Sequence, residues 1–192
     1  MPTRQRLTRQ TWIEAALVAL AERGVAGVAV EPLAQRLGST KGSFYWHFAD
    51  RDALLLAALE QWEQAQTEAV IERLQPLEAG PERLEALLRL TVARSTQDLS
   101  VRLGDDAEHP LVAPVLLRVT RRRIQYLAAL LVEGGLPPLT ADRRAHLTYA
   151  VYLGWSHLHR TVLREHALDQ EELDAYVAEL LRVLDRPHPS SD

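Results

Sequence analysis

Apolar residues recur three and four positions apart along almost the whole chain, and no stretch alternates convincingly between apolar and polar residues. This spacing places side chains on one face of an α-helix, whereas alternation is typical of a half-buried strand. With 47% hydrophobic residues among 192, the chain has enough apolar material to bury a core. The pattern therefore predicts an all-α protein.

Glycines, prolines and capping residues set the limits that we expect for the helices. The first is expected to end at Gly24, because glycine often follows the last turn of a helix. The last begins at Asp169, which forms a capping box with Glu172. Between them, we expect helices over residues 30–37, 40–48, 50–75, 84–91, 114–133 and 140–162. The stretch from Asp98 to Pro110 reads as a loop.

The charge of the chain is unevenly distributed. Residues 1–51 contain seven basic and four acidic residues, a net charge of +3, whereas the remainder contains 15 basic and 22 acidic residues, a net charge of −7. This asymmetry indicates an anion-binding front end on an acidic body. The chain contains no cysteine, which excludes disulfides and thiolate metal sites. The sequence has neither a signal peptide nor an apolar run of membrane-spanning length, so we expect a soluble, cytoplasmic protein.

The most informative segment runs from Val30 to Phe48 and predicts two short helices that cross closely. Such a crossing needs a small residue at the contact and a turn residue that tolerates positive φ, for which Ala34 and Gly38 are suited. Phe44 and Phe48 share one face and would pack the second helix against the core. These features are typical of a helix-turn-helix.

The opposite face of the second helix is rich in hydrogen-bond donors. A helix start with short hydroxyls and a cation suits a phosphate, and side chains further along can reach base edges in the major groove. Lys41 is the only lysine of the chain, against 21 arginines, and Gly42 would let the backbone approach a phosphate. The donor face comprises Ser39, Thr40, Lys41, Ser43, Tyr45, Trp46 and His47.

The segment GSTKGSFYWHF, from Gly38 to Phe48, resembles the N-terminal domain of TetR-type transcriptional regulators. The preceding Ala21–Gly24 and the following Ala49–Leu56 also match, so the resemblance covers about residues 8–56. It implies about nine helices, of which the first three bind DNA, the fourth connects, and the last two form a four-helix bundle with a second subunit. It also implies a ligand pocket in the body.

Carried over residue by residue, the resemblance implies a set of DNA-contacting residues. These are Thr40, Lys41, Gly42, Ser43, Tyr45, Trp46, His47 and Arg51. Three positions depart from the family pattern. Ala29 stands where a capping Ser or Thr is usual, Glu31 brings a negative charge toward the DNA side, and His47 stands where Tyr is more usual, which could change the base preference. We therefore expect binding to depend on the second short helix and on an arginine-rich N-terminal arm.

The body has no motif of its own, and its candidate sites come from helical stripes. Tyrosines on the helix after Thr140 could line a ligand pocket or simply belong to the core, and the sequence leaves both open. The ligand-contact candidates are Trp62, Tyr126, Tyr149 and Tyr152. The dimer candidates, expected to pack knobs-into-holes, are Leu147, Val151, Trp155, Leu158, Leu173, Tyr176, Val177 and Leu180.

Three charged or metal-like clusters have ordinary interpretations beside functional ones. His157 and His159 are two residues apart and point to nearly opposite helix faces, so a metal site is not expected. The acidic stretch from Asp105 to His109 fits a solvated loop better than a cation site. Arg121–Arg123 fits a solvated face, an anionic-ligand contact or a salt bridge to the acidic body.

Together these features predict a sequence-specific DNA-binding regulator that acts as a homodimer on a palindromic site in double-stranded DNA. We expect a repressor released by a small, mostly hydrophobic effector, although no motif determines the direction of regulation. The expected domains are a helix-turn-helix domain over residues 1–50, a ligand-binding and dimerisation domain over residues 51–186, and a flexible tail over residues 187–192. No nucleophile–base pair, metal spacing or phosphate loop indicates an enzyme, a cofactor or a metal.

Overall fold

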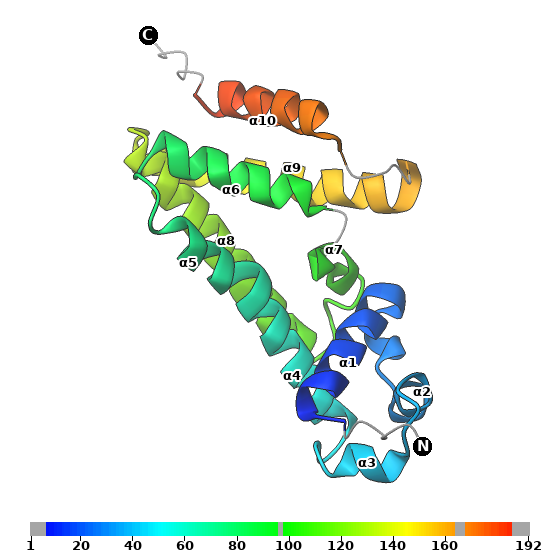
Figure 1. The fold of residues 1–192 in the computed structure, drawn as a ribbon. Helices are drawn as coiled ribbons and strands as arrows, with labels where there is room; N and C mark the ends of the chain where they lie inside the picture. Colours follow the sequence, from blue (N-terminus) through cyan, green and yellow to red (C-terminus); the bar gives the residue numbers. More distant parts are fainter. Residues whose placement is uncertain (1–6, 96–97, 164–167, 186–192) are drawn as a thin grey trace. The chain divides into compact units, whose positions relative to one another are not determined.

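The structure is a computed structural model that describes residues 7–95, 98–163 and 168–185 (Figure 1). These residues form helices and turns, and contain no strand. The all-α prediction is therefore confirmed. None of the helices within the described ranges is long and apolar enough to cross a membrane.

The N-terminal elements follow the predicted order closely. The donor-rich helix is shorter than expected and ends at Tyr45 rather than Phe48, while the connecting helix continues through a π-helical turn into the next element. The elements are α1 (Arg9–Arg23), a 3-10 turn η1 (Val25–Gly27), α2 (Val30–Arg36), α3 (Lys41–Tyr45), α4 (Arg51–Glu63), η2 (Gln64–Glu68) and α5 (Ala69–Leu74).

The remaining elements form the rest of the helical body. A second π-helical segment, η4, extends α9 at its C-terminal end. The elements are α6 (Pro81–Ala93), α7 (Leu99–Gly104), α8 (Val112–Glu133), α9 (Pro138–His157), η4 (Leu158–Leu163) and α10 (Gln170–Asp185). Counting α4–η2–α5 and α9–η4 as continuous, the described residues form nine α-helical segments, as the resemblance implies.

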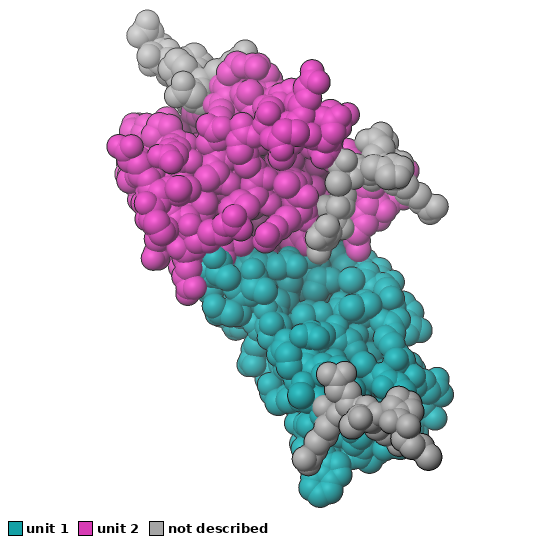
Figure 2. Space-filling model, viewed as in Figure 1, with its two compact units in different colours: residues 1–69, 99–120 teal, residues 70–98, 121–192 magenta. Residues whose placement is uncertain are grey.

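The chain divides into two compact units (Figure 2). Unit 1 comprises residues 1–69 and 99–120, and unit 2 comprises residues 70–98 and 121–192. These units differ from the expected division after residue 50, because α4 and α7 pack with the N-terminal helices. The expected tail, residues 187–192, lies outside the described residues.

The core of unit 1 forms around α1, which packs against α4 and α7. Trp12, Leu20 and Phe44 are fully buried in this core. The α7 residues Leu99 and Leu103, one helical turn apart, extend it. Burying these apolar side chains stabilises the unit because apolar surface leaves water.

The core of unit 2 forms where α6, α8, α9 and α10 bring their apolar faces together. Leu88 of α6, Leu130 and Leu131 of α8, and Ala145 of α9 are buried in one cluster with Val177 of α10. The small alanine on α9 permits close approach of neighbouring helices, because its side chain ends at Cβ.

Two expectations about the body are wrong. Residues 98–110 are not all loop, because Leu99–Gly104 form α7 and place Leu99 and Leu103 in the core of unit 1. The helix expected from residue 140 begins earlier than predicted, since α9 starts at Pro138 with Pro137 at the N-cap position. Proline suits a first helical turn because that turn needs no backbone donor.

Candidate nucleic-acid interface

The turn between α2 and α3 has the geometry that the sequence predicts. Gly38 has a φ of 59°, in the left-handed region where side chains with a Cβ are strained. Its N–H donates to the Gln35 carbonyl at 3.0 Å, and the Ser39 N–H donates to the Ala34 carbonyl at 2.8 Å. These bonds end α2 and direct the chain into α3.

Three aromatic rings fix α3 against α1. The rings of Trp12 and Phe44 meet edge to face with centroids 5.4 Å apart, and Phe44 and Phe48 stack with centroids 5.7 Å apart. Phe44 and Phe48 are buried, as their one-turn spacing predicts. Because the inner face of α3 is packed in this way, its opposite face is directed to solvent.

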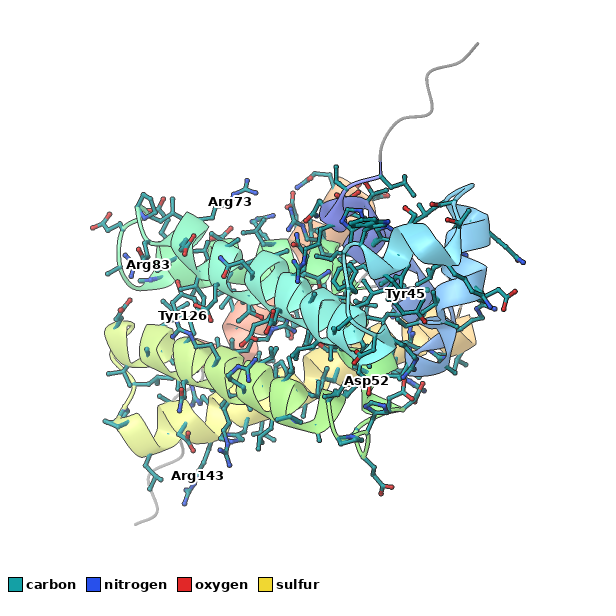
Figure 3. All side chains as sticks on the ribbon, turned by 90° about the horizontal axis from the view of Figure 1, so that it is seen from below. Tyr45, Asp52, Arg73, Arg83, Tyr126 and Arg143 are labelled. Atoms are coloured by element: carbon teal, nitrogen blue, oxygen red, sulfur yellow. The ribbon has the colours of Figure 1, made fainter. Side chains whose placement is uncertain are left out.

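Two aromatic side chains at the outward face of α3 are strongly exposed to solvent. Trp46 is 88% exposed and Tyr45 is 59% exposed, which is costly for a monomer unless these rings contact a partner. Figure 3 shows Tyr45 on this short helix. Thr40, Lys41 and Gly42 are exposed beside them, whereas Ser43 and His47 are half-buried. The predicted contact residues of α3 therefore lie together on one accessible side of unit 1.

Thr40 has a second, structural role at the start of α3. It is the N-cap residue, and its Oγ1 accepts a hydrogen bond from the Ser43 N–H at 3.2 Å. The hydroxyl hydrogen remains able to donate, because an accepted bond uses only a lone pair. In contrast, α2 begins at the N-cap Ala29 without a side-chain hydrogen bond, as its methyl group requires.

Lys41 forms an ion pair with the acidic residue that departs from the family pattern. Its Nζ lies 2.9 Å from the Glu31 Oε2, and both side chains remain more than half exposed. The hydrogen bond and charge of Glu31 raise the pKa of Lys41 above its ordinary value. Glu31 thus turns toward α3 and joins the surface on which DNA contacts were expected.

Arg51 makes contacts that the resemblance did not imply. Its Nε donates to the Val28 carbonyl at 2.6 Å and its Nη2 donates to the Val25 carbonyl at 2.8 Å. Its Nη1 lies 3.1 Å from the Asp52 Oδ1. The guanidinium therefore connects the start of α4 to the segment before α2, so a phosphate contact by Arg51 would use its remaining N–H groups.

The N-terminal end of α1 contributes one further cation. The Arg9 guanidinium lies over the Phe48 ring, 4.9 Å from its centroid, a cation–π contact that places positive charge near the end of α3. Arg4 and Arg6 of the predicted basic arm lie outside the described residues.

Unit 2 contains a buried polar cluster that the sequence did not predict as a whole. The Asp98 Oδ2 accepts a hydrogen bond from the Tyr152 hydroxyl at 2.6 Å and lies 2.8 Å from the Arg123 Nη1. Burial disfavours the charged form of Arg123, but Asp98 together with the nearby Tyr149 and Tyr152 outweighs this and raises the pKa of the guanidinium. The salt-bridge interpretation of the arginine run thus holds for Arg123, while Arg121 is exposed.

The four candidate ligand residues lie in different surroundings. Tyr126, Tyr149 and Tyr152 belong to unit 2, and the buried hydroxyls of Tyr126 and Tyr149 have no hydrogen-bond partner among the described residues. Tyr126 lies near Arg83 (Figure 3), and burial raises its pKa. Trp62 is instead a core residue of unit 1, where its Nε1 donates to Gln66.

The predicted dimer stripe of α9 and η4 is an exposed apolar surface. Leu147 is 68% exposed, and Val151, Leu158 and Val162 are exposed along the same stripe. On the other side of α9, Ala141, Ala145, Tyr149 and Ser156 are buried. We call the four exposed residues the α9 stripe.

The remaining dimer candidates are less accessible. Val177 is buried in the core of unit 2, so its assignment to an exposed dimer face is wrong. Leu173 and Leu180 pack against the same core. Trp155 lies between His159 and Tyr176, with ring centroids 3.8 Å and 4.2 Å away. Leu173, Val177 and Leu180 of α10 thus pack within their own subunit, because the amphipathic helix has one apolar face.

The histidine pair and the acidic stretch both contact other residues of the chain. His159 is buried against Trp155 and its Nδ1 lies 3.0 Å from the Trp155 carbonyl, whereas His157 is exposed. In the acidic stretch, Asp105 pairs with Arg102, and the Asp106 Oδ2 accepts a hydrogen bond from the Val25 N–H at 2.8 Å. Sequence reasoning missed this role of Asp106, because nothing local marks a contact with a residue 81 positions away.

The geometry of unit 1 defines a helix-turn-helix with an exposed second helix, on a chain whose other described elements are helical. Residues 13–58 match the family model described as bacterial regulatory proteins, tetR family. This segment is therefore similar to the DNA-binding segment of tetR-family regulators.

The similar curated proteins match over a short stretch of the chain. The class D tetracycline repressor protein of Escherichia coli is 44% identical over 50 residues, which are 26% of this chain and 23% of the repressor. The class A repressor from transposon 1721 is 46% identical over 55 residues, 29% of this chain and 26% of that protein. The matched segment thus spans about a quarter of these relatives' length.

Solved structures resemble the whole fold at low identity. A TetR-family regulator from Agrobacterium tumefaciens has a TM-score of 0.75 at 18% identity, covering 91% of this chain and 96% of that one. A Saccharomonospora viridis protein in complex with choline has a TM-score of 0.74 at 20% identity, with 92% and 95% covered. AibR, in complex with isovaleryl coenzyme A and operator DNA, has a TM-score of 0.68 at 18% identity, with 89% and 96% covered. These likenesses concern the fold.

Proposed function

We propose that this protein is a sequence-specific, DNA-binding transcriptional regulator that binds its operator through α3. The observation that carries the proposal is the outward face of α3, where Tyr45 and Trp46 are exposed beside Lys41 while Phe44 and Phe48 fix the helix from behind. The match of residues 13–58 to the tetR family model supports it. We assign the chain no enzymatic activity, in keeping with a transcription factor.

The contacts on DNA divide by chemistry. We assign phosphate contacts to Thr40, Lys41, Ser43 and Tyr45, whose hydroxyls and ammonium can donate to phosphate oxygens, with Gly42 allowing close approach. Trp46 and His47 would contact bases or sugars, because side chains beyond the helix start reach the groove. For Arg51 we propose a phosphate contact through the N–H groups that do not bind Val25 and Val28.

We propose that the regulator acts as a homodimer on a palindromic site. One α3 reads too few base pairs to be selective, and a two-fold dimer would double the contacts on half-sites about 10 bp apart. The α9 stripe supports this assembly, since Leu147, Val151 and Leu158 expose apolar surface that a second copy could cover. Trp155, Leu173, Tyr176 and Leu180 would border this interface.

We propose that unit 2 binds a small effector that is mostly hydrophobic and has at least one hydrogen-bonding group. The buried hydroxyls of Tyr126 and Tyr149 would hydrogen-bond to that group, because buried tyrosine hydroxyls usually have partners. Tyr152 would border the site beside Asp98. The choline and isovaleryl coenzyme A complexes of proteins with this fold support a ligand-responsive body.

Binding of the effector would release the DNA and so relieve repression. For release, the effector must bind the state that does not bind DNA more tightly than the one that does, by a few kcal/mol. We propose a repressor rather than an activator because curated tetracycline repressors are similar to a stretch of this chain.

The test of DNA binding begins with selection of duplexes from a random library by the purified full-length protein. We expect a palindromic consensus and binding that weakens steeply with salt, since phosphate contacts release counterions. Tyr45→Phe should lower affinity without changing the consensus, and His47→Ala should relax one position per half-site. A library with no enriched sequence would overturn sequence-specific binding.

The test of the effector is a thermal-shift screen of small molecules, followed by DNA-binding assays with each compound that raises the melting temperature. A true effector stabilises the folded state because it binds that state preferentially. It should also weaken the DNA complex and lose its effect in Tyr149→Phe. A compound set that stabilises the protein but leaves DNA binding unchanged would argue against release.

A further inference from the structure

The ion pair of Lys41 and Glu31 lies on the surface that we assign to DNA. Glu31 is in the first turn of α2 and Lys41 is the first residue of α3, with Nζ and Oε2 2.9 Å apart. Thr40, Tyr45 and Trp46 are exposed on neighbouring positions of the same short segment. The charge available for a phosphate at this place is therefore already compensated by an acid of the protein itself.

Exposure makes this pair easy to exchange. The Lys41 side chain is 57% exposed and that of Glu31 is 62% exposed, so water and salt weaken their attraction. A DNA phosphate could take the place of the Glu31 carboxylate. The exchange would leave the Glu31 carboxylate without its ion pair. The carboxylate would then lie close to the phosphate, and the two negative charges would repel each other.

We propose that Glu31 is an affinity-determining residue, which pairs with Lys41 in the free protein and weakens the phosphate contact of Lys41 in the DNA complex. This inference rests on the proposed function. It assigns to Glu31 a sequence-independent effect, because a phosphate contact has no information about the bases. Operator and unrelated DNA would therefore be weakened by the same factor.

The chain offers a matched control for a change of charge at Glu31. Glu22 of α1 also pairs with a cation of α2, since its Oε2 lies 2.5 Å from the Arg36 Nη2, and both side chains of that pair are partly exposed. Glu22→Gln and Glu31→Gln each remove one negative charge from the same unit. The two variants differ in which cation is released.

The experiment measures the affinity of full-length variants for a selected operator and for an unrelated duplex of equal length, over a series of salt concentrations. At low salt, Glu31→Gln should raise affinity for both duplexes by about three- to tenfold per subunit, and should steepen the salt dependence by up to about one unit per subunit. Glu22→Gln should change either affinity by less than about twofold. Melting temperatures verify that both variants fold.

A double-variant cycle isolates the pair. In a Lys41→Ala background, Glu31→Gln should change affinity by less than about twofold, because the cation that Glu31 compensates is gone. A gain that persists in this background, or an equal gain for Glu22→Gln, would overturn the inference in favour of a general charge effect. A loss of operator binding alone in Glu31→Gln would also overturn it, since a carboxylate that accepts from cytosine N4 reads a base.

The failure of this inference can be distinguished from failure of the proposed function. A wild-type protein that binds no duplex would overturn both. A wild-type protein that binds its operator, with Glu31→Gln of unchanged affinity for either duplex, would overturn the role of Glu31 alone.

Discussion

The Asp106 carboxylate accepts a hydrogen bond from the backbone N–H of Val25, with Oδ2 and N 2.8 Å apart. The carbonyl of Val25 accepts a hydrogen bond from Arg51. The short turn between α1 and α2 is therefore bound on one side by the segment after α7 and on the other by the start of α4. Val25 itself is buried, so water is poorly placed to substitute for either partner.

Removal of this acceptor should destabilise unit 1. Asp106→Ala leaves a buried N–H unpaired and should lower the free energy of unfolding by about 1–3 kcal/mol. Asp106→Asn keeps an oxygen acceptor and should cost less. Urea unfolding measures both, with Asp105→Ala as the control, because Asp105 is exposed and pairs with Arg102 on the same helix end. Equal losses for Asp105→Ala and Asp106→Ala would contradict the assignment.

Gly38 and Gly42 should respond oppositely to a methyl group. Gly38 has positive φ and open space around it, so Gly38→Ala should cost about 1–2 kcal/mol of stability through backbone strain alone. Gly42 is helical, and a Cβ there would meet Thr40 Oγ1 at 3.7 Å, an ordinary contact. Gly42→Ala should therefore fold at least as stably as wild type but bind DNA less tightly, if the backbone there approaches a phosphate. Thermal unfolding and DNA titration separate the two effects, and a Gly38→Ala protein as stable as wild type would contradict the first.

The local features of α2, α3 and the turn between them could be predicted from the sequence, because each depends on residues close together in the chain. The positive φ of Gly38, the buried pair Phe44 and Phe48, and the exposed donors of α3 all follow from spacing within about twenty residues. The capping box of Asp169 and Glu172 is also local, with the two reciprocal bonds at 3.0 and 2.9 Å.

The features that could not be predicted depend on tertiary packing. Leu99 and Leu103 form α7 because the core of unit 1 buries them, although the acidic residues that follow suggested a loop. Val177 reads as one more member of an apolar stripe, and its burial is decided by α6 packing against α10. Arg123 cannot be told from Arg121 by sequence, since the difference lies in Asp98 of a distant helix connection.

The buried pair of Arg123 and Asp98 should be much more important for stability than the exposed arginine beside it. Arg123→Met leaves the Asp98 carboxylate buried without this partner and should lower the free energy of unfolding by about 3–5 kcal/mol. Arg121→Met, on the exposed side of the same helix, should change it by less than about 0.5 kcal/mol. Chemical denaturation compares them directly. Similar effects of the two substitutions would show that the Asp98 pair is not buried in solution.

The stability of the fold at alkaline pH should depend on Tyr152. Burial, with the charge and hydrogen bond of Asp98, raises the pKa of Tyr152 above its ordinary value. The unfolded chain therefore loses this proton first, so the contribution is fully present below about pH 10 and decreases as the pH rises toward the folded-state pKa. Tyr152→Phe should lower stability at neutral pH and flatten its alkaline decline by up to about 1.4 kcal/mol per pH unit.

Urea unfolding between pH 8 and 11 provides this measurement. Burial also raises the pKa of Tyr126 and of Tyr176, so the variant should keep part of the decline. Identical slopes for Tyr152→Phe and wild type above pH 10 would exclude Tyr152 as a contributor.

The α9 stripe should control assembly without controlling folding. Leu147 is 68% exposed, so Leu147→Glu removes little from the core and should leave the melting temperature of the isolated subunit nearly unchanged. In a dimer, the carboxylates would be buried in an apolar interface without partners, and the assembly should dissociate. Trp155→Glu is a less selective variant, since Trp155 stacks on His159 and Tyr176 within its own chain.

Light scattering at micromolar concentration should therefore give a dimer for wild type and a monomer for Leu147→Glu. Val132→Glu is the control, because Val132 is an exposed apolar residue of the same unit on α8, outside the α9 stripe. It should remain dimeric. The monomeric variant should also bind the palindromic operator weakly, since each head alone makes half the contacts. A monomeric wild type, or a Leu147→Glu protein that dimerises as tightly as wild type, would show that a second copy does not cover this stripe.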